Sequence, residues 1–100
     1  MKTTIQEVDG RVVVTLEGEM DTAAAVEVDE QLKPFYTEQD KDIIFDCKGL
    51  EYIASSGLRI LLSILKAAKA CGHQVVMRNV NEDIKNVFEL TGFVNIFTFE

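Results

Sequence analysis

The alternation of apolar and polar residues predicts two strands near the amino terminus. Residues 4–8 alternate weakly and residues 11–16 alternate strongly, as in strands with one buried face. Between them, Asp9 and Gly10 form a pair typical of a two-residue hairpin turn. The apolar face of the second strand consists of Val12, Val14 and Leu16.

Apolar residues spaced by three and four predict a first helix after the break at residues 18–22, where Asp21 or Thr22 can cap it. Its stripe consists of Ala25, Val28, Leu32 and Phe35. Pro34 indicates an end or a kink close by. A third helix is expected to begin after Asn81 and to end at Gly92. Its inward residues are expected to be Ile84, Val87 and Phe88.

The second helix is expected over residues 55–71, with Gly72 as its stop. Its apolar content is broad, because two faces carry large apolar residues. One consists of Leu58, Leu61, Leu62, Leu65 and Ala68, and the other of Ile60, Ile64 and Ala67. Either both faces are buried within the domain, or part of the first turn, with Leu58, stays exposed as a docking patch.

Short apolar runs predict the remaining strands, at residues 43–45, 75–77 and 96–99. The resulting order is strand-strand-helix-strand-helix-strand-helix-strand. It predicts an α/β fold, with a mixed sheet of about five strands, right-handed crossovers and three helices packed mainly on one face. One hundred residues are enough for a single domain, expected to span residues 1–100.

Two adjacent hydroxyls, Ser55 and Ser56, stand before Gly57 at the start of the second helix. A helix start presents unpaired backbone N–H groups and the positive end of a dipole. One interpretation is that a serine caps the helix. The other is that the helix start receives an anion, either a ligand or a phosphate attached to a serine.

Two carboxylates are expected near this helix start. Asp21 follows the second predicted strand and Asp46 follows the third, so in a parallel arrangement both reach the edge where the Ser55 helix begins. They can act as a helix cap and a turn cap. Alternatively, they form an acidic rim around Ser55 that holds a partner's cation or orients a hydroxyl.

Other chemistry is scarce. The chain has neither a phosphate-binding loop nor a dinucleotide fingerprint. His73 lies beyond the far end of the second helix, out of reach of Ser55 for a catalytic triad. Cys47 and Cys71 are expected at opposite edges, too far apart for a disulfide, and their spacing is not that of a zinc site. We expect no cofactor and no metal.

Charge and hydropathy restrict the partners. The net charge of −7 argues against nucleic acid as the main partner, and no apolar run is long enough for direct membrane insertion. The amino terminus has no apolar signal core, so a cytoplasmic protein is expected.

These residues resemble the STAS domains, and in particular the small bacterial anti-sigma-factor antagonists (anti-anti-sigma factors). The similarity covers nearly the whole chain and is most specific over residues 50–58, with support from the Gly-Glu-Met-Asp turn at 18–21 and from the apolar strand followed by Asp46. Ala54 stands where the family often has an acidic residue, and Arg59 where a glycine often follows.

The resemblance implies a binding switch rather than an enzyme. The unmodified domain would bind an anti-sigma factor that is also a serine kinase, and so release a sigma factor. Phosphorylation of Ser55, or in second place Ser56, would end binding, and a serine phosphatase would reset the switch. The expected partner-binding residues are Asp21, Asp46, Ser55, Ser56, Gly57, Leu58 and Arg59. The runner-up is a constitutive STAS adaptor in a stress-signalling scaffold or transporter complex, and a small enzyme using the carboxylate rim comes third.

Overall fold

The computed structural model describes residues 1–37 and 41–100, and the side chains of all of these except residues 35–37. The chain begins with an antiparallel hairpin of β1 (Lys2–Val8) and β2 (Arg11–Met20). Its turn residues, Asp9 and Gly10, have φ values of 52° and 76°. Positive φ at both central residues is what a type I′ turn requires, so the predicted hairpin is confirmed.

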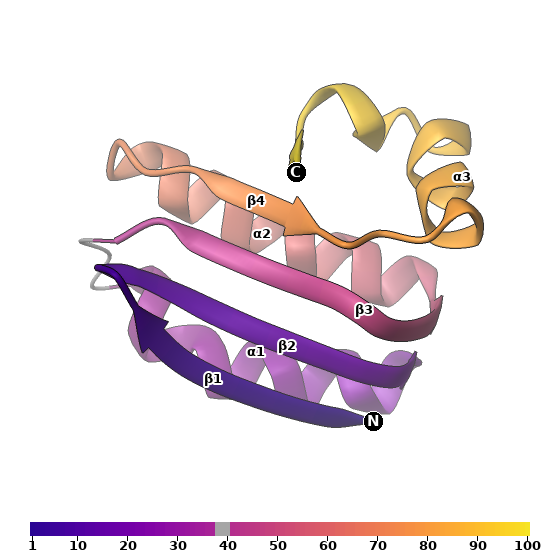
Figure 1. Cartoon of the computed structure of the whole chain (residues 1–100), viewed down its shortest axis with the longest axis horizontal. Helices are drawn as coiled ribbons and strands as arrows, with labels where there is room; N and C mark the ends of the chain where they lie inside the picture. The colour runs from indigo at the N-terminus through magenta and orange to yellow at the C-terminus, as the bar shows by residue number, and fades with distance from the viewer. Residues whose placement is uncertain (38–40) are drawn as a thin grey trace.

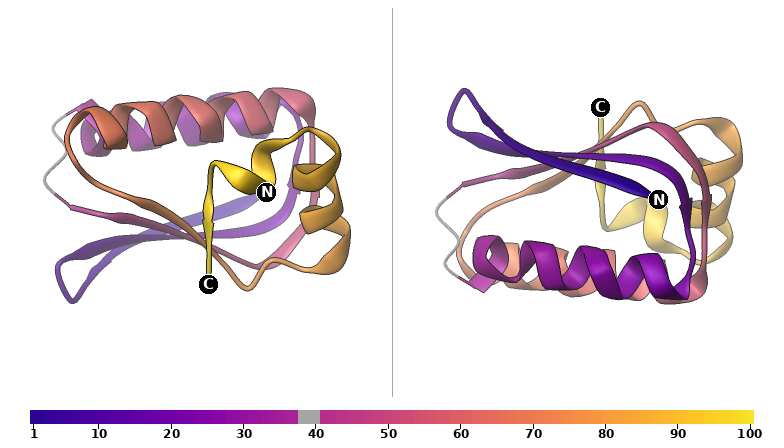
Figure 2. Two further views of the ribbon diagram at one scale, coloured as in Figure 1. Left: turned by 90° about the horizontal axis from the view of Figure 1, so that it is seen from above. Right: turned by 90° about the horizontal axis from the view of Figure 1, so that it is seen from below.

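Three further strands join β2 in parallel, in the spatial order β1-β2-β3-β4-β5. They are β3 (Ile43–Ile53), β4 (Val75–Arg78) and β5 (Thr98–Phe99). The helices α1 (Thr22–Thr37) and α2 (Ser55–Ala70) cover one face of the sheet, whereas α3 (Glu82–Leu90) lies at one end of it (Figures 1 and 2). The predicted α/β fold with a mixed five-stranded sheet is confirmed.

One hydrophobic core fills the space between the sheet and the helices α1 and α2. The second strand contributes its predicted face, and the helices contribute their stripes. Largest among the fully buried side chains are Phe45, Phe88, Leu16, Met20, Leu32 and Ile43. Phe88 on α3 packs edge-to-face against both Phe97 and Phe99, which closes the core beside β5. The predicted inward position of Phe35 lies outside the described side chains.

The third strand is much longer than its apolar run. It continues from Ile43 to Ile53, and two extra residues relative to β2 are absorbed, one between the pairs Thr15–Asp46 and Glu17–Gly49 and one between the pairs Gly18–Leu50 and Glu19–Tyr52. Asp46, which was expected to follow the strand, therefore lies inside it, as does Cys47. In its second half β3 buries only every third residue, Cys47, Leu50 and Ile53, so this half forms neither a continuous apolar run nor a regular alternation.

The last part of the chain is less regular than predicted. Asn81 caps α3 as expected, but the helix ends at Leu90, two residues before Gly92. A short 3-10 helix, η1 (Phe93–Asn95), takes up part of the following segment, and only Thr98 and Phe99 pair as β5. The predicted strand over 96–99 is therefore half its expected length.

Candidate functional site

The helix α2 begins without a side-chain cap. Its N-cap residue is Ala54, in an extended conformation, and no side chain accepts a hydrogen bond at this position. Ser55 and Ser56 are the first two residues of the helix, so the capping interpretation is wrong for both. The backbone N–H groups of the first turn are consequently available to an anion, and the hydroxyl of exposed Ser55 lies beside them.

Hydrogen bonds connect the starts of α1 and α2. The Ala54 N–H donates to the Met20 carbonyl at 2.9 Å, and the Ser56 hydroxyl lies 3.2 Å from that of Thr22. Residues 20–22 and 53–56 thus meet at the carboxyl ends of β2 and β3. We call these two segments the Ser55 edge.

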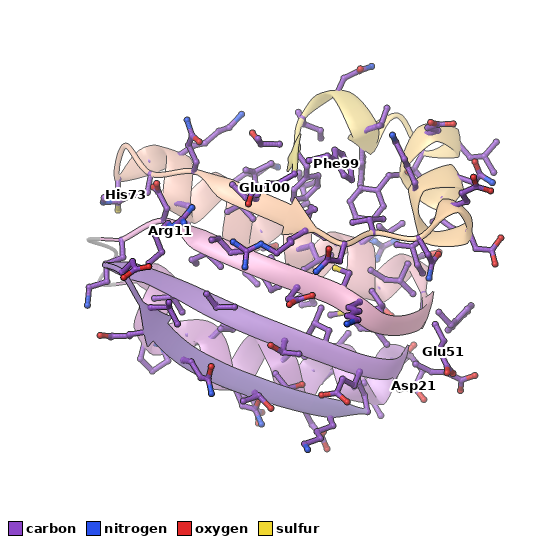
Figure 3. All side chains as sticks on the ribbon, viewed as in Figure 1. Arg11, Asp21, Glu51, His73, Phe99 and Glu100 are labelled. Atoms are coloured by element: carbon purple, nitrogen blue, oxygen red, sulfur yellow. The ribbon has the colours of Figure 1, made fainter. Side chains whose placement is uncertain are left out.

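Asp21 lies on the Ser55 edge, as the sequence predicted. Its carboxylate accepts a hydrogen bond from the Ala24 N–H at 2.9 Å and so caps α1. Its side chain and that of Glu51 both lie at this end of the sheet, whereas His73 lies at the opposite end (Figure 3). His73 contacts Asp42 there, at 3.5 Å, which agrees with the expectation of a loop histidine remote from Ser55.

Asp46 does not belong to the Ser55 edge, and its predicted position there is wrong. It lies in the middle of β3, level with Thr15 on β2 and Arg78 on β4. One carboxylate oxygen accepts hydrogen bonds from the Lys48 N–H and from the Asn79 side-chain amide, both at 3.1 Å. The carboxylate is thereby held within the sheet and does not form a rim around Ser55.

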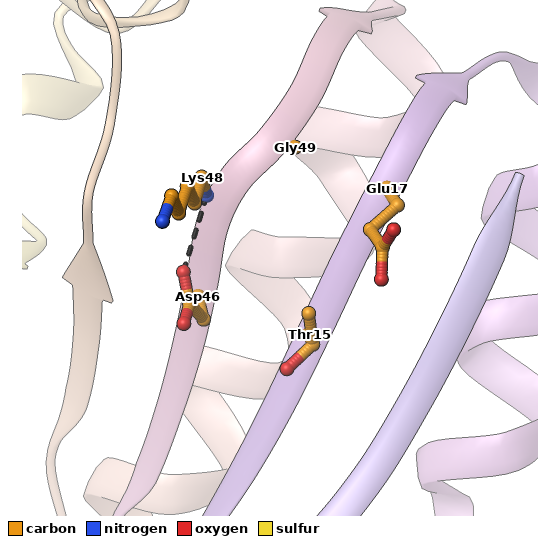
Figure 4. A pocket seen from close by; sticks show the side chains of 5 residues that line it. All are labelled: Thr15, Glu17, Asp46, Lys48 and Gly49. Carbon is orange, nitrogen blue, oxygen red and sulfur yellow. Dashed lines mark hydrogen bonds between the residues drawn. The ribbon is translucent and has the colours of Figure 1, made fainter.

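Asp46 instead lines a pocket of about 440 Å³, shown in Figure 4. The other lining residues are Thr15, Glu17, Lys48 and Gly49. A side chain at position 49 would come within 2.9 Å of Glu17, so glycine here lets the Glu17 side chain lie against β3. The pocket belongs to β2 and β3 and contains no residue of the Ser55 edge.

The first turn of α2 is accessible only on its outward side. Leu58 is 4% exposed, so the alternative in which it forms an exposed docking patch is wrong. Gly57 is also buried, against Ile53 and Met20. A partner can therefore reach Ser55 and Arg59, which are exposed, but not the side of the turn that carries Gly57 and Leu58.

Tyr52 and Glu51 are exposed residues near the Ser55 edge that the sequence analysis did not select. Tyr52 is 51% exposed, which is unusual for a large aromatic side chain inside a strand. It pairs with Glu19 of β2. Both residues were missed because the third strand was expected to end near Phe45. A strand continued to Ile53 places them at the edge.

The other titratable and nucleophilic side chains that the structure describes do not form a metal site or a reactive thiol site. Within residues 1–37 and 41–100, no cluster of three or more His, Cys, Asp or Glu side chains can hold a metal ion. Both cysteines are free thiols. Burial, and next the negative charge of Asp46, raise the pKa of the Cys47 thiol to about 12, which makes it a poor nucleophile.

None of the helices in the described part of the chain has the length and hydrophobicity that crossing a bilayer requires.

The fold and the Ser55 edge together define a STAS domain. The STAS domain family profile matches residues 2–100, and the chain belongs to that family.

Relatives and solved structures give the comparison more detail. BtrV of Bordetella bronchiseptica, named as an anti-sigma factor antagonist, is 29% identical over 97 residues, 97% of this chain and 84% of BtrV. The anti-sigma-B factor antagonist of Staphylococcus aureus is 28% identical over 83 residues, covering 83% of this chain and 77% of that protein. The phosphorylated form of the Bacillus cell fate determinant SpoIIAA superposes with a TM-score of 0.80 at 20% identity, over 99% of this chain and 91% of SpoIIAA. That likeness shows the shared fold.

Proposed function

We propose that this chain is an anti-sigma factor antagonist that binds an anti-sigma factor with serine-kinase activity in the cytoplasm and is released by phosphorylation of Ser55. The main observation in support of this proposal is that Ser55 is exposed at the uncapped start of α2, on the same edge as Asp21. The names of the relatives BtrV and the Staphylococcus aureus antagonist support the partner class. The chain acts here as a binding partner and kinase substrate, not as an enzyme.

Ser55 is the preferred acceptor over Ser56 on structural grounds. The Ser56 side chain is half-buried and its hydroxyl contacts that of Thr22. Ser55 is exposed, and its hydroxyl makes no hydrogen bond with any residue that the structure describes. A kinase can therefore approach Ser55 without separating α1 from α2. SpoIIAA, which shares the fold, has been solved in unphosphorylated and phosphorylated forms.

The physical effect of phosphorylation differs between the domain and its interface. A phosphate on Ser55 adds about −1.5 to −2 charges next to the open N–H groups of α2, where a helix dipole favours negative charge. The isolated domain therefore accommodates the group easily. In a complex the same dianion must lose its water and face the partner's groups, which can cost several kcal/mol. Each 1.4 kcal/mol is tenfold in affinity, so the fold can persist while the partner leaves.

The decisive experiment is incubation with Mg-ATP and the candidate anti-sigma kinases of the organism, followed by intact mass measurement and phosphosite mapping. We expect one added phosphate on Ser55 and loss of kinase binding. Ser55→Ala should keep binding but accept no phosphate, whereas Ser56→Ala, its matched control, should still be modified. Labelling that Ser56→Ala alone abolishes would overturn the acceptor assignment. A serine phosphatase should restore binding.

A second candidate is a constitutive STAS adaptor, favoured by one feature of the site. Ala54 supplies no acidic group beside Ser55, and the first turn of α2 contains no acidic residue at all. An adaptor would bind its partner stably, for instance in a stress-signalling scaffold or a transporter complex, and would ignore the kinase. Binding without modification in the same experiment would identify this function, and absence of both would remove the two candidates together.

A further inference from the structure

The outward face of α2 is basic in an acidic protein. The helix sequence contains Arg59, Lys66 and Lys69 and not one aspartate or glutamate, although the whole chain carries a net charge of −7. All three cationic side chains are exposed. The helix therefore has a local charge of opposite sign to that of the molecule.

The three cationic residues lie on the same face of α2 as Ser55. Counting from Ser55, residues at i, i+4, i+7, i+11 and i+14 lie along one face of an α-helix. These residues are Ser55, Arg59, Leu62, Lys66 and Lys69. We call them the basic stripe. It extends for about 21 Å at 1.5 Å per residue. Ser56, about 100° around the helix from Ser55, contacts Thr22 on α1, so the basic stripe does not face α1.

Apart from Lys69, which lies in the last turn of α2 where the helix dipole favours a cation, these charges have no stabilising role within the described fold. Among the described residues, none forms an ion pair with Arg59, Lys66 or Lys69. Lys66 and Lys69 are three residues apart, and like charges at that spacing repel each other across a helix turn. Exposed cations without an internal ion-pair partner are available for an external one. Half-buried Leu62 adds an apolar contact between the cations.

We propose that the basic stripe binds an acidic amphipathic helix of the anti-sigma factor, about four turns long, with carboxylates spaced to meet Arg59, Lys66 and Lys69. The inference rests on the proposed function and specifies the chemistry of its partner. It also gives the phosphate a target: a dianion on Ser55 lies one helix turn from Arg59. The net charge of the stripe then falls from +3 to roughly +1, so the attraction for a carboxylate-rich partner is much weaker.

Other occupants fit the charges less well. Recognition of an anionic membrane usually takes four to eight clustered cations, whereas the stripe has three and the molecule as a whole repels an anionic surface. A second copy offers the exposed acids Glu27 and Glu30 of α1. Two copies of a chain with a net charge of −7 repel each other, which makes this contact less favourable.

The test compares two double variants with the same change in charge. Lys66→Glu with Lys69→Glu reverses the stripe, while Lys48→Glu with Lys85→Glu reverses two exposed lysines on β3 and α3. Affinity is measured by titration calorimetry against each anti-sigma factor that binds the wild-type chain. We expect the stripe variant to lose more than about tenfold and the control less than about threefold. Equal losses would overturn the proposal.

A second probe separates this proposal from the proposed function. It is a synthetic amphipathic peptide about four turns long, with glutamates at i, i+4, i+7 and i+11, titrated into the labelled full chain and followed by NMR. We expect amide shifts along residues 59–69 that disappear in the stripe variant. Absence of these shifts would overturn the proposal that the basic stripe binds an acidic helix, whether or not an anti-sigma factor binds the chain. Shifts without anti-sigma binding would retain the stripe and remove the proposed function.

Two controls address the other occupants. Co-sedimentation of the wild-type chain, but not of the stripe variant, with phosphatidylserine vesicles would assign the stripe to a membrane and overturn the proposal. Concentration-dependent association of the wild-type chain in analytical ultracentrifugation, lost in the stripe variant, would assign it to a second copy with the same consequence.

Discussion

Gly57 shows how a single position fixes the start of α2. A Cβ atom at this residue would lie 2.8 Å from Cγ1 of Ile53 and 3.2 Å from Cγ of Met20. Glycine is thus required by close packing of the helix on the ends of β2 and β3. The resemblance to STAS domains implies Gly57 as a partner-binding residue, whereas the structure buries it in this packing contact.

Gly57→Ala should therefore destabilise the protein in spite of alanine's higher helix propensity. Overpacking costs about 1–3 kcal/mol, and the propensity gain returns about 1 kcal/mol, so a net loss of about 1 kcal/mol is expected. Urea unfolding followed by circular dichroism measures it. Ser63→Ala, at an exposed position of the same helix, is the control and should change the free energy of unfolding by less than about 0.5 kcal/mol. Equal effects would contradict the packing argument.

Cys47 and Cys71 differ in reactivity because only one is buried. Burial and the charge of Asp46 raise the pKa of the Cys47 thiol from 9.0 to about 12, and Cys71 is exposed. We expect a thiol reagent at neutral pH to label Cys71 in the folded protein and Cys47 only after unfolding. Mass mapping of the labelled peptides tests this. Equal labelling rates for both residues in the native protein would contradict it.

The same thiol makes stability depend on pH in the alkaline range. Below pH 9 the thiol is protonated in both states, so its contribution to stability is constant. Above pH 9 the unfolded chain releases the proton while the folded chain keeps it until about pH 12, so stability falls as pH rises through this window. Cys47→Ala should remove this part of the decline in chemical unfolding measured between pH 8 and pH 11. An unchanged slope would contradict the assignment.

At the scale of elements, Asn81 joins α3 to the sheet. Its side-chain oxygen accepts from the Ile84 N–H at 2.9 Å, and its amide donates to the Leu50 carbonyl of β3 at 3.0 Å. Asn81→Ala should lose both bonds and about 2 kcal/mol of stability. Asn81→Asp keeps the cap and loses the donor, so it should cost about half as much. Thermal unfolding of both variants, with exposed Asn86→Ala as the neutral control, tests the two contributions separately.

The elements that were predicted correctly are those with a strong local signal. The Asp9–Gly10 turn, the β2 alternation and the Asn81 cap each depend on residues close together in the chain. The second half of β3 was missed because its pairing with β2 includes two extra residues, and only the long-range register makes residues 46–53 a strand. The same error placed Asp46 at the Ser55 edge and hid Tyr52.

Helix caps show a second limit of local reasoning. Serines near a helix start are commonly caps, but the boundary here is fixed by the bond from the Ala54 N–H to the Met20 carbonyl, a tertiary contact. Ser55 is therefore inside the first turn. What sequence could supply was the composition of the site. The expected start at Ser55 is confirmed, but the sequence left open whether a serine caps the helix, and the N-cap position of Ala54 leaves the Ser55 hydroxyl without that role.

At the scale of the whole molecule, the two carboxylates that were expected near Ser55, those of Asp21 and Asp46, lie in different surroundings. Asp21 caps α1 at the Ser55 edge, next to the layer of helices, while Asp46 lies within the sheet and is held by Lys48 and Asn79. Recognition by a kinase that acts on Ser55 should depend on the first carboxylate and ignore the second. Replacing each carboxylate by its amide therefore compares the two positions with the same change of charge.

Asp21→Asn and Asp46→Asn each remove one negative charge, and asparagine caps a helix about as well as aspartate, so the α1 start is preserved. We expect Asp21→Asn to lower the affinity for the anti-sigma kinase, or the rate of Ser55 phosphorylation, by about tenfold, as for a charge at an interface. Asp46→Asn should change either quantity by less than about threefold. Urea unfolding of both variants shows whether folding is intact. A larger effect of Asp46→Asn in a folded protein would move the recognition surface to the pocket between β2 and β3, and the Ser55 edge would then be only the place of modification.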